Sequence, residues 1–336
     1  MKYTLTFIIM LLLLLSPAWC RAGGGGYLFV TFKGESPNGE QIHFALSRDG
    51  RTWTALNESK PVLVSQIGEK GARDPYLLRT EDGRFILVAT DLSIYLKRKE
   101  VGNGPATWKQ VVESGSKSLV IWESTNLVNW IGPRLANVAP KDAGCAWAPE
   151  AIYDPAAGDY LVFWASTTAT DHFKKHRIWA CHTKDFREFS PPAVYIQRDS
   201  GTIDTTIVHD GQMYYRFSKD ETRKAIIMES SSQLAGPWKE VDGFSLATTL
   251  GIEGPECYPL HAKSTGEPTT WCLIVDAYAK SQGYQPYNTL DLSKGNFTKA
   301  EGFSFPFKFR HGTVLPISGE EYTRLEKAFS TNVVKP

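Results

Sequence analysis

The sequence predicts an all-β fold, a five-bladed β-propeller. Short hydrophobic and aromatic runs alternate with turns of Gly, Asp, Asn and Pro from Tyr27 onward, and helical periodicity is convincing only in the tail near residues 320–328. These runs also form a unit that repeats at about 50 residues, the period expected of one propeller blade. In addition, a polar motif recurs once in each unit, at the start of its first strand.

Five units follow one another along the chain. Each contains two predicted strands, a polar turn and an aromatic residue. The strand pairs are 27–32 with 42–46, 85–90 with 118–122, 160–164 with 177–180, 213–217 with 225–228, and 271–275 with 287–289. Five tryptophans occupy repeated positions in these units and are expected in the core between blades. They are Trp122, Trp130, Trp164, Trp179 and Trp238.

The spacing of the recurring polar motif predicts the number of blades. Its five versions are Arg73-Asp74-Pro75, Trp147-Ala148-Pro149-Glu150, Ile203-Asp204-Thr205-Thr206, Glu253-Gly254-Pro255 and Arg310-His311-Gly312. The steps from Asp74 to Glu150, Asp204, Glu253 and His311 are 76, 54, 49 and 58 residues. These steps fit four-stranded blades with insertions in the first interval. The last blade is then split between both chain ends, which would close the ring and leave no exposed sheet edge.

Residues 1–22 have the pattern of a secretory signal peptide, and residues 23–336 that of one propeller domain. A short positive end precedes an apolar run at 5–15 that is too short to span a membrane, and no other stretch is long and apolar enough to do so. The protein is therefore expected to be secreted or periplasmic. Lipid attachment at Cys20 is the less favoured alternative, because the bulky Trp19 precedes that cysteine.

The composition argues against nucleic acid as a partner. The 336 residues are 42% hydrophobic with a formal net charge of +1, and Lys and Arg are spread along the chain. An uncharged, sugar-like ligand fits this balance better than a polyanion. We expect a monomer with buried free thiols, although one disulfide stays open as an alternative. The cysteines concerned are Cys145, Cys181, Cys257 and Cys272.

The polar motifs predict a site with acid–base chemistry. In a propeller the first strand of every blade lines the central channel, so the polar residues of the motifs would converge at one end of it. They are Asp74, Glu150, Asp204, Glu253 and His311. Several carboxylates in one cleft are electrostatically costly, and packing does not require them. Glycoside hydrolysis does require them: an acid protonates the leaving oxygen, a carboxylate activates water, and a third carboxylate raises the pKa of the acid by repulsion.

The ordered set of motifs resembles glycoside hydrolase family 43, the five-bladed β-propeller enzymes of arabinan and xylan breakdown, over about residues 27–318. The resemblance implies an inverting mechanism. It assigns Asp74 as the general base, Asp204 as the residue that modulates the pKa of the acid and orients it, and Glu253 as the general acid.

The same resemblance implies roles for four further residues. Trp147 and Glu150 would line the substrate pocket, and Trp147 would stack on a sugar. Arg310 and His311 would contact the substrate. His311 also resembles the histidine that in many family members binds calcium in the channel, directly or through water. No other cofactor is expected.

The expected function is therefore that of an exo-acting glycosidase that removes terminal sugars from plant polysaccharide side chains. An α-L-arabinofuranoside is the first choice of substrate, and a β-xyloside or β-galactoside stays open because the loops of the pocket decide between them. Two other classes compete with this interpretation. A non-catalytic carbohydrate-binding propeller would not need both the acid and the base, and a protein-interaction scaffold would not need converging carboxylates.

Overall fold

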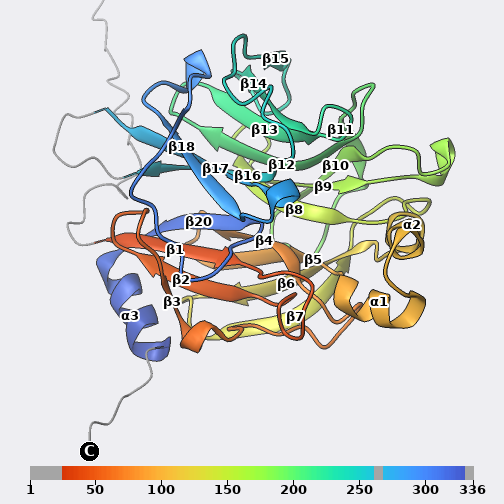
Figure 1. The fold of residues 1–336 in the computed structure, drawn as a ribbon, viewed down its shortest axis with the longest axis horizontal. Helices are drawn as coiled ribbons and strands as arrows, with labels where there is room; N and C mark the ends of the chain where they lie inside the picture. Colours follow the sequence, from red (N-terminus) through yellow and green to blue (C-terminus); the bar gives the residue numbers. More distant parts are fainter. Residues whose placement is uncertain (1–24, 261–267, 330–336) are drawn as a thin grey trace, which may run out of the picture.

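The structure is a computed structural model that describes residues 25–260 and 268–329, and it confirms the five-bladed β-propeller (Figure 1). Five antiparallel sheets of four strands each form the blades. The predicted signal peptide and Cys20 lie outside the described residues. Within the described ranges, no helix combines the length and the apolar character needed to cross a membrane.

Each blade runs from an innermost strand at the channel to an outermost strand at the rim. The innermost strands are β4 (Arg73–Arg79), β8 (Trp147–Asp154), β12 (Thr202–His209), β16 (Glu253–Leu260) and β20 (Gly312–Ile317). Their second strands are, in the same order, β5 (Phe85–Thr90), β9 (Asp159–Ser166), β13 (Tyr214–Asp220), β17 (Thr270–Asp276) and β1 (Gly26–Thr31). The third strands are β6 (Ser118–Ser124), β10 (Arg177–Thr183), β14 (Ala225–Ser231), β18 (Tyr284–Thr289) and β2 (His43–Ser47). The outermost strands are β7 (Trp130–Asn137), β11 (Ala193–Ile196), β15 (Lys239–Glu240), β19 (Thr298–Lys299) and β3 (Thr54–Ala55).

The innermost strands contact one another in a closed ring, in the order β20, β4, β8, β12, β16 and back to β20. β20 pairs antiparallel with β1, from Gly26 opposite Ile317 to Thr31 opposite Gly312. One blade therefore contains strands from both ends of the described chain. This pairing places the residues just before β20 beside the starts of the other innermost strands.

The hydrophobic core is divided among the spaces between neighbouring blades. Successive side chains of a strand face opposite sides of its sheet. In β5, Leu87 therefore shares a cluster with Phe44 of one neighbouring blade, whereas Ile86 shares a cluster with Trp164 of the other. Both faces are covered, which is why these strands appear in the sequence as continuous hydrophobic runs. The predicted core tryptophans lie in these spaces, Trp122 and Trp164 almost fully buried and Trp130, Trp179 and Trp238 partly so.

The four described cysteines confirm the expectation of free thiols. All are buried and none is paired in a disulfide: Cys145, Cys181, Cys257 and Cys272. The short connections include four turns of 3-10 helix: η2 (Asn57–Ser59), η3 (Ala169–Asp171), η4 (Tyr278–Lys280) and η5 (Leu292–Lys294). The helical tail is also confirmed, as α3 (Gly319–Phe329) packs beside β1.

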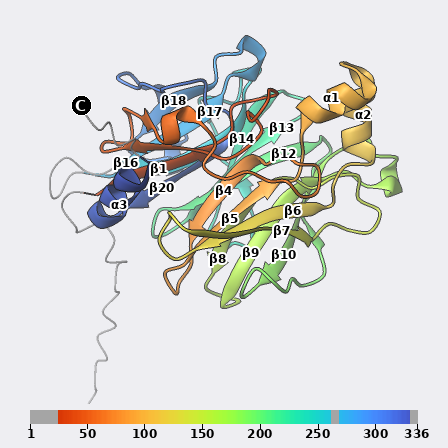
Figure 2. The same ribbon diagram turned by 90° about the horizontal axis from the view of Figure 1, so that it is seen from below.

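Two helices between β5 and β6 correct the sequence-based expectation that only the tail is helical. They are α1 (Ile94–Val101) and α2 (Pro105–Glu113), and they project from one end of the propeller (Figure 2). α1 buries only Ile94, so no apolar stripe marks it in the sequence. Its first turn is instead fixed by buried Glu40, which accepts hydrogen bonds from the backbone N–H groups of Ile94 (2.8 Å) and Tyr95 (2.9 Å).

Candidate active site

One end of the channel is shaped by a β-bulge that four blades share. In β4, β8, β12 and β16 the pairing with the second strand skips two residues. The first residue skipped has a positive φ in every case: Asp74 (48°), Ala148 (46°), Asp204 (50°) and Gly254 (52°). A bulge bends the strand and redirects its side chains, and non-glycine residues in this left-handed region are strained. Such strain is common at active sites.

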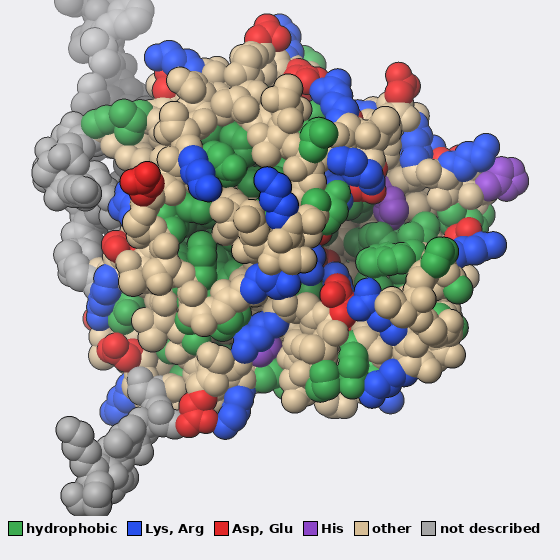
Figure 3. All heavy atoms as spheres, in the orientation of Figure 1, with side chains coloured by type: hydrophobic (Ala, Val, Ile, Leu, Met, Phe, Trp, Pro, Cys, Tyr) green, Lys and Arg blue, Asp and Glu red, His purple; other side chains and the backbone are tan. Residues whose placement is uncertain are grey.

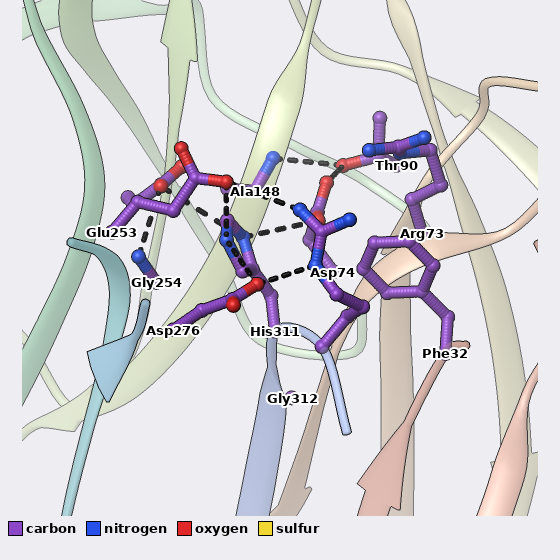
Figure 4. A network of polar contacts seen from close by, with 12 residues as sticks. Phe32, Arg73, Asp74, Thr90, Ala148, Glu253, Gly254, Asp276, His311 and Gly312 are labelled. Carbon is purple, nitrogen blue, oxygen red and sulfur yellow. Dashed lines mark hydrogen bonds and ion pairs between the residues drawn. The ribbon is translucent and has the colours of Figure 1, made fainter. Parts of the chain in front are cut away.

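Asp74 is held as an ionised carboxylate at the β4 bulge. Its Oδ2 accepts a hydrogen bond from Thr90 Oγ1 at 2.8 Å, and its Oδ1 lies 3.2 Å from Nδ1 of His311 (Figure 4). Burial disfavours the charge, but the hydrogen bond with His311, its charge and the charge of Arg73 outweigh burial and lower the pKa of Asp74. An ionised carboxylate is what a general base requires.

Glu253 lies on the other side of His311, at the residue before the β16 bulge. Its Oε1 is 3.2 Å from both His311 Nε2 and Arg310 Nη2, and its Oε2 accepts a hydrogen bond from Lys219 Nζ at 2.6 Å. Burial opposes ionisation, but His311 and Lys219 hold the pKa of Glu253 well below its usual range. The expectation that repulsion raises this pKa is therefore wrong for the free site, because the charges of His311 and Lys219 outweigh burial.

Asp204, and not Glu253, is the carboxyl whose pKa is raised. Its Oδ2 accepts a hydrogen bond from the N–H of Gly254 at 3.1 Å, which fixes the backbone beside Glu253. Burial raises the pKa of Asp204, His311 lowers it and the Glu253 charge raises it again, to about 6. The two carboxyls interact, so a proton that binds as the pH falls belongs to the pair, and Asp204 is the easier of the two to protonate.

His311 connects these groups from the residue before β20. Both ring nitrogens face carboxylates, Nδ1 towards Asp74 and Nε2 towards Glu253 (Figure 4). Burial disfavours the imidazolium, but Asp204, Asp74 and Glu253 raise its pKa well above the usual value. Gly254 leaves the space that the ring occupies, since a Cβ there would lie 2.3 Å from the ring carbon Cδ2. The site thus contains a cation between two carboxylates.

Arg310 lies beside His311 and contacts Glu253. Contact of Arg310 with a substrate stays a prediction. Its guanidinium donates a hydrogen bond from Nε to Asp276 Oδ2, and Asp276 is completely buried at the end of β17. Arg310 is therefore held in place by a second carboxylate behind it.

Glu150 lines the same cavity but lies two residues past the β8 bulge residue, Ala148. Its counterparts at the same step in other blades are Tyr76, Thr206 and Glu256. Burial and the charge of Glu256 raise the pKa of Glu150 well above its usual value, and burial raises the pKa of Glu256 to about 8. Glu150 therefore lines one cavity with Asp74, Asp204 and His311, as the sequence predicted, although it lies further along its strand than the bulge.

Trp147 lies one residue before the β8 bulge and forms part of a wall. Its half-buried ring packs against a small cluster of Leu92, Ile94 and Val111 and lies 4.9 Å, between ring centres, from His176. Of the described residues, it is not among those that line the cavity around Asp74 and His311. Stacking of Trp147 on a sugar therefore stays a prediction.

From the sequence, Lys219 was expected to belong to sheet structure first, and no role in the site was predicted for any of the residues that support it from the second strands. Thr90, Lys219 and Asp276 lie opposite the residue that precedes the bulge in β4, β12 and β16. Each of them contacts a residue of the group around His311. In the sequence, each of these three residues is a polar residue at the end of a hydrophobic run. This pattern is also typical of an ordinary turn, so it does not predict a role in the site.

One group of residues has the ligand types of a candidate calcium site: the ligand atoms of Asp204, Glu253 and His311 lie within 4.8 Å of one another. Calcium takes six to eight oxygen ligands. Here both nitrogens of His311 face carboxylates, and Lys219 and Arg310 contact the oxygens of Glu253. This arrangement does not fit calcium bound directly by His311. Calcium held through water elsewhere in the channel stays a prediction, which metal analysis of the purified protein would test.

Positive and negative side chains are interspersed on the face in Figure 3, which agrees with the absence of a basic patch in the sequence.

Comparisons with known proteins agree with this geometry. Residues 24–323 match a family described as a probable glycosyl hydrolase domain and related to glycoside hydrolase family 43. A curated α-L-arabinofuranosidase from Bifidobacterium longum subsp. longum is 29% identical over 297 residues, and the match covers 76% of this chain and 27% of that protein. The chain thus spans about a quarter of the curated relative it matches.

Two solved structures share the fold at 13% sequence identity. One is a candidate exo-β-1,3-galactanase from Bifidobacterium bifidum s17, with a TM-score of 0.53 over 86% of this chain and 91% of that one. The other is a β-1,3-galactosidase of glycoside hydrolase family 43, with a TM-score of 0.51 over 81% of this chain and 52% of that one. Because the family match extends over almost the whole described chain, the chain belongs to the family of probable glycosyl hydrolase domains related to glycoside hydrolase family 43.

Proposed function

We propose that the chain is an inverting exo-glycosidase that removes terminal sugars from polysaccharide side chains, with α-L-arabinofuranosides as its first substrates. The observation that carries the proposal is the pair of carboxylates, Asp74 and Glu253, on opposite sides of one imidazole. The two ring nitrogens of an imidazole point away from each other, so carboxylates at their ends stand well apart. An inverting pair needs about 6.5–9.5 Å between its carboxyls to hold a water molecule.

In the proposed reaction, Asp74 takes a proton from water while the water oxygen forms a bond to the anomeric carbon. Glu253 gives its proton to the glycosidic oxygen as the bond from that oxygen to the anomeric carbon breaks. The sugar leaves with inverted configuration. Asp74 ends protonated and Glu253 ionised, and the site resets when a proton returns through solvent to the pair of Asp204 and Glu253.

The acid must hold a proton when the sugar is bound, although Asp204 is the carboxyl that is easier to protonate in the free site. Entry of a sugar excludes water, which disfavours a second charge on the pair and keeps one proton on it. The glycosidic oxygen then lies next to Glu253, and we infer that the shared proton moves to that residue. The role of Asp204 is to keep one proton in the pair and to fix the backbone of Gly254.

Three observations support the choice of substrate. The 29% identity to an α-L-arabinofuranosidase favours that sugar. α1 and α2 follow β5, whose Thr90 contacts Asp74, and helices inserted close to the site would favour a terminal sugar over the middle of a chain. The predicted signal segment would place the activity outside the cytoplasm.

The test is a panel of 4-nitrophenyl glycosides, with α-L-arabinofuranoside, β-xyloside and β-galactoside as members, and NMR of the first anomer released. We expect turnover of the arabinofuranoside with inversion, and loss of about 10²–10⁴-fold in kcat for Glu253→Ala on a substrate with a poor leaving group. Azide should restore activity to Asp74→Ala, because a small nucleophile takes the place of the activated water.

Three outcomes would contradict the proposal. Retention of configuration would exclude an inverting pair. Undiminished activity of Glu253→Ala on a substrate with a poor leaving group would exclude that residue as the acid. Sugar binding without turnover of any member of the panel would favour the non-catalytic carbohydrate-binding propeller.

A further inference from the structure

Lys219 is a buried lysine next to the proposed acid. It is 4% exposed and lies in β13, opposite Ile203 at the β12 bulge. Its Nζ is 2.6 Å from Glu253 Oε2 and 2.9 Å from Glu221 Oε1, and it lies 4.5 Å from the ring centre of Tyr278. Burial of a lysine ammonium carries an unfavourable desolvation free energy, even between two carboxylates. The buried position of Lys219 therefore suggests a functional role.

We propose that Lys219 is a positioning residue that orients Glu253 for proton donation, and that Glu221 receives the lysine when Glu253 carries its proton. The inference rests on the proposed function, because it assigns a partner to the acid of that reaction. Lys219 stays protonated throughout and gives no proton to the substrate.

The two oxygens of Glu253 are held differently, and this difference carries the inference. Oε1 contacts Arg310 and His311, which are adjacent in the chain and are themselves fixed by Asp276 and Asp74. Within the described residues, Lys219 is the only cation in contact with Oε2. Oε1 is therefore the anchored oxygen, and Oε2 is the one that can carry a proton once Lys219 withdraws.

Glu221 gives Lys219 a second place at almost the same distance. Its Oε1 lies 2.9 Å from Nζ, against 2.6 Å for Glu253 Oε2, so a small movement of the flexible lysine stem changes which carboxylate is paired. When Glu253 is ionised, Lys219 neutralises it. When Glu253 is protonated, the ammonium retains a full ion pair with Glu221 and leaves Oε2 free to face the glycosidic oxygen.

The position of Lys219 in its blade has counterparts in two other blades. Thr90 and Asp276 lie at the equivalent place opposite the residue before the bulge. Thr90 donates a hydrogen bond to Asp74, and Asp276 accepts one from Arg310. The fold thus uses this place repeatedly to hold a channel residue, which argues against a chance ion pair at Lys219.

The test separates proton donation from the rest of the reaction. A 4-nitrophenyl glycoside has a good leaving group and needs little help from an acid, whereas a methyl glycoside of the same sugar needs the acid fully. For Lys219→Met we expect a loss in kcat of about 10–100-fold on the methyl glycoside, with less than about a 3-fold change in its KM. Activity on the 4-nitrophenyl glycoside should change by less than about 3-fold, and Lys219→Arg should recover most of the loss.

Lys224→Met is the matched control, because Lys224 contacts Glu221 at 2.9 Å from the solvent side and is not paired with Glu253. It should behave as the wild type on both substrates. Glu221→Gln provides a second test if Lys219→Met does not fold, since a lysine with no second carboxylate should stay on Glu253 and slow the methyl glycoside selectively.

Equal losses of Lys219→Met on both substrates, or no loss on either, would overturn the inference, as would a Glu221→Gln variant that is unchanged on both. Glu253→Ala distinguishes this failure from that of the proposed function. If Glu253→Ala loses the methyl glycoside selectively and Lys219→Met does not, only the role of Lys219 is wrong. If Glu253→Ala shows no such selectivity, the assigned acid itself is wrong.

Discussion

At the scale of single residues, the charges around His311 decide which carboxyl holds a proton. Turnover by the proposed mechanism needs Asp74 ionised and one proton on the pair of Asp204 and Glu253. The pKa of Asp74 lies below the usual value for an aspartate, and that of Asp204 is about 6. We therefore expect kcat/KM to rise at low pH as Asp74 ionises and to fall as the pH increases through about 6, where the pair loses its proton.

Asp204→Asn tests this assignment. Without Asp204, the remaining proton must be held by Glu253 alone, and the cations keep the pKa of Glu253 well below its usual range. The basic limb of the profile should then move to lower pH, and little activity should be left at pH of about 6. A basic limb that stays near pH 6 in the variant would assign the titrating group to another residue.

Gly254 makes a second prediction at this scale. It has a φ of 52°, and a Cβ would lie 2.3 Å from the His311 ring, so Gly254→Ala should displace the imidazole. We expect kcat/KM to fall by more than about 100-fold while the chain still folds, since a displacement of about 1 Å can cost that much. Gly302→Ala is the control, because its φ is 76° but its Cβ would meet nothing within 4 Å. Comparable activity losses in both variants would attribute the effect to backbone strain alone.

At the scale of elements, the sequence predicted the strands better than the alignment of their motifs. Asp74 and Asp204 are the first residues of their bulges. Glu253 lies one residue before the bulge of β16, and His311 lies just before β20. Glu150 lies two residues past Ala148, the first bulge residue of β8. A bulge changes which side chains face the channel without changing the hydrophobic pattern, so no pattern in the sequence predicts it. Four of the five predicted polar residues line one cavity, but their different positions relative to the bulge were not predicted.

Helix α1 shows how an element can form without a sequence pattern of its own. Glu40 accepts hydrogen bonds from its first turn and also pairs with Arg73, at 2.7 Å, beside Asp74. Glu40→Ala should therefore destabilise the protein by about 3–5 kcal/mol, because it leaves the Arg73 charge without one of its two carboxylates and two N–H groups unpaired. Urea unfolding measures this change. Glu35→Gln is the control, since Glu35 also contacts Arg73 but does not contact α1; an equal loss in both variants would contradict the capping role.

At the scale of the whole molecule, the repeat in the sequence predicted the number of blades and the pairing of the two chain regions in one sheet. Both follow from local patterns, since hydrophobic runs and turns recur with the period of a blade. The contacts of Lys219 and Asp276 did not follow, because each joins side chains of two neighbouring blades that are 34 residues apart in the sequence. His311 contacts Asp74 from the opposite end of the chain.

The ring of innermost strands also brings Glu256 to the middle of the molecule. Its Oε1 accepts a hydrogen bond from the N–H of Val314 at 2.7 Å and so connects β16 to β20, and it is 4% exposed. Burial raises its pKa from 4.5 to about 8. A carboxyl whose folded-state pKa is raised contributes its full stability below its unfolded pKa, and this stability is lost as the pH rises through about 8.

Glu256→Gln should remove this dependence, because glutamine keeps the acceptor for Val314 and cannot ionise. Each unit of pKa shift corresponds to about 1.4 kcal/mol, so the variant should be more stable than the wild type at pH 7 by on the order of 3 kcal/mol, and the gain should vanish near pH 4. Thermal or urea unfolding at the two pH values measures the gain, with the exposed Glu301→Gln as a control that should gain nothing. A gain that does not change with pH would mean that Glu256 does not titrate in this range. A loss at both pH values would mean that the carboxylate itself holds β16 and β20 together, and that closure of the ring depends on a buried charge.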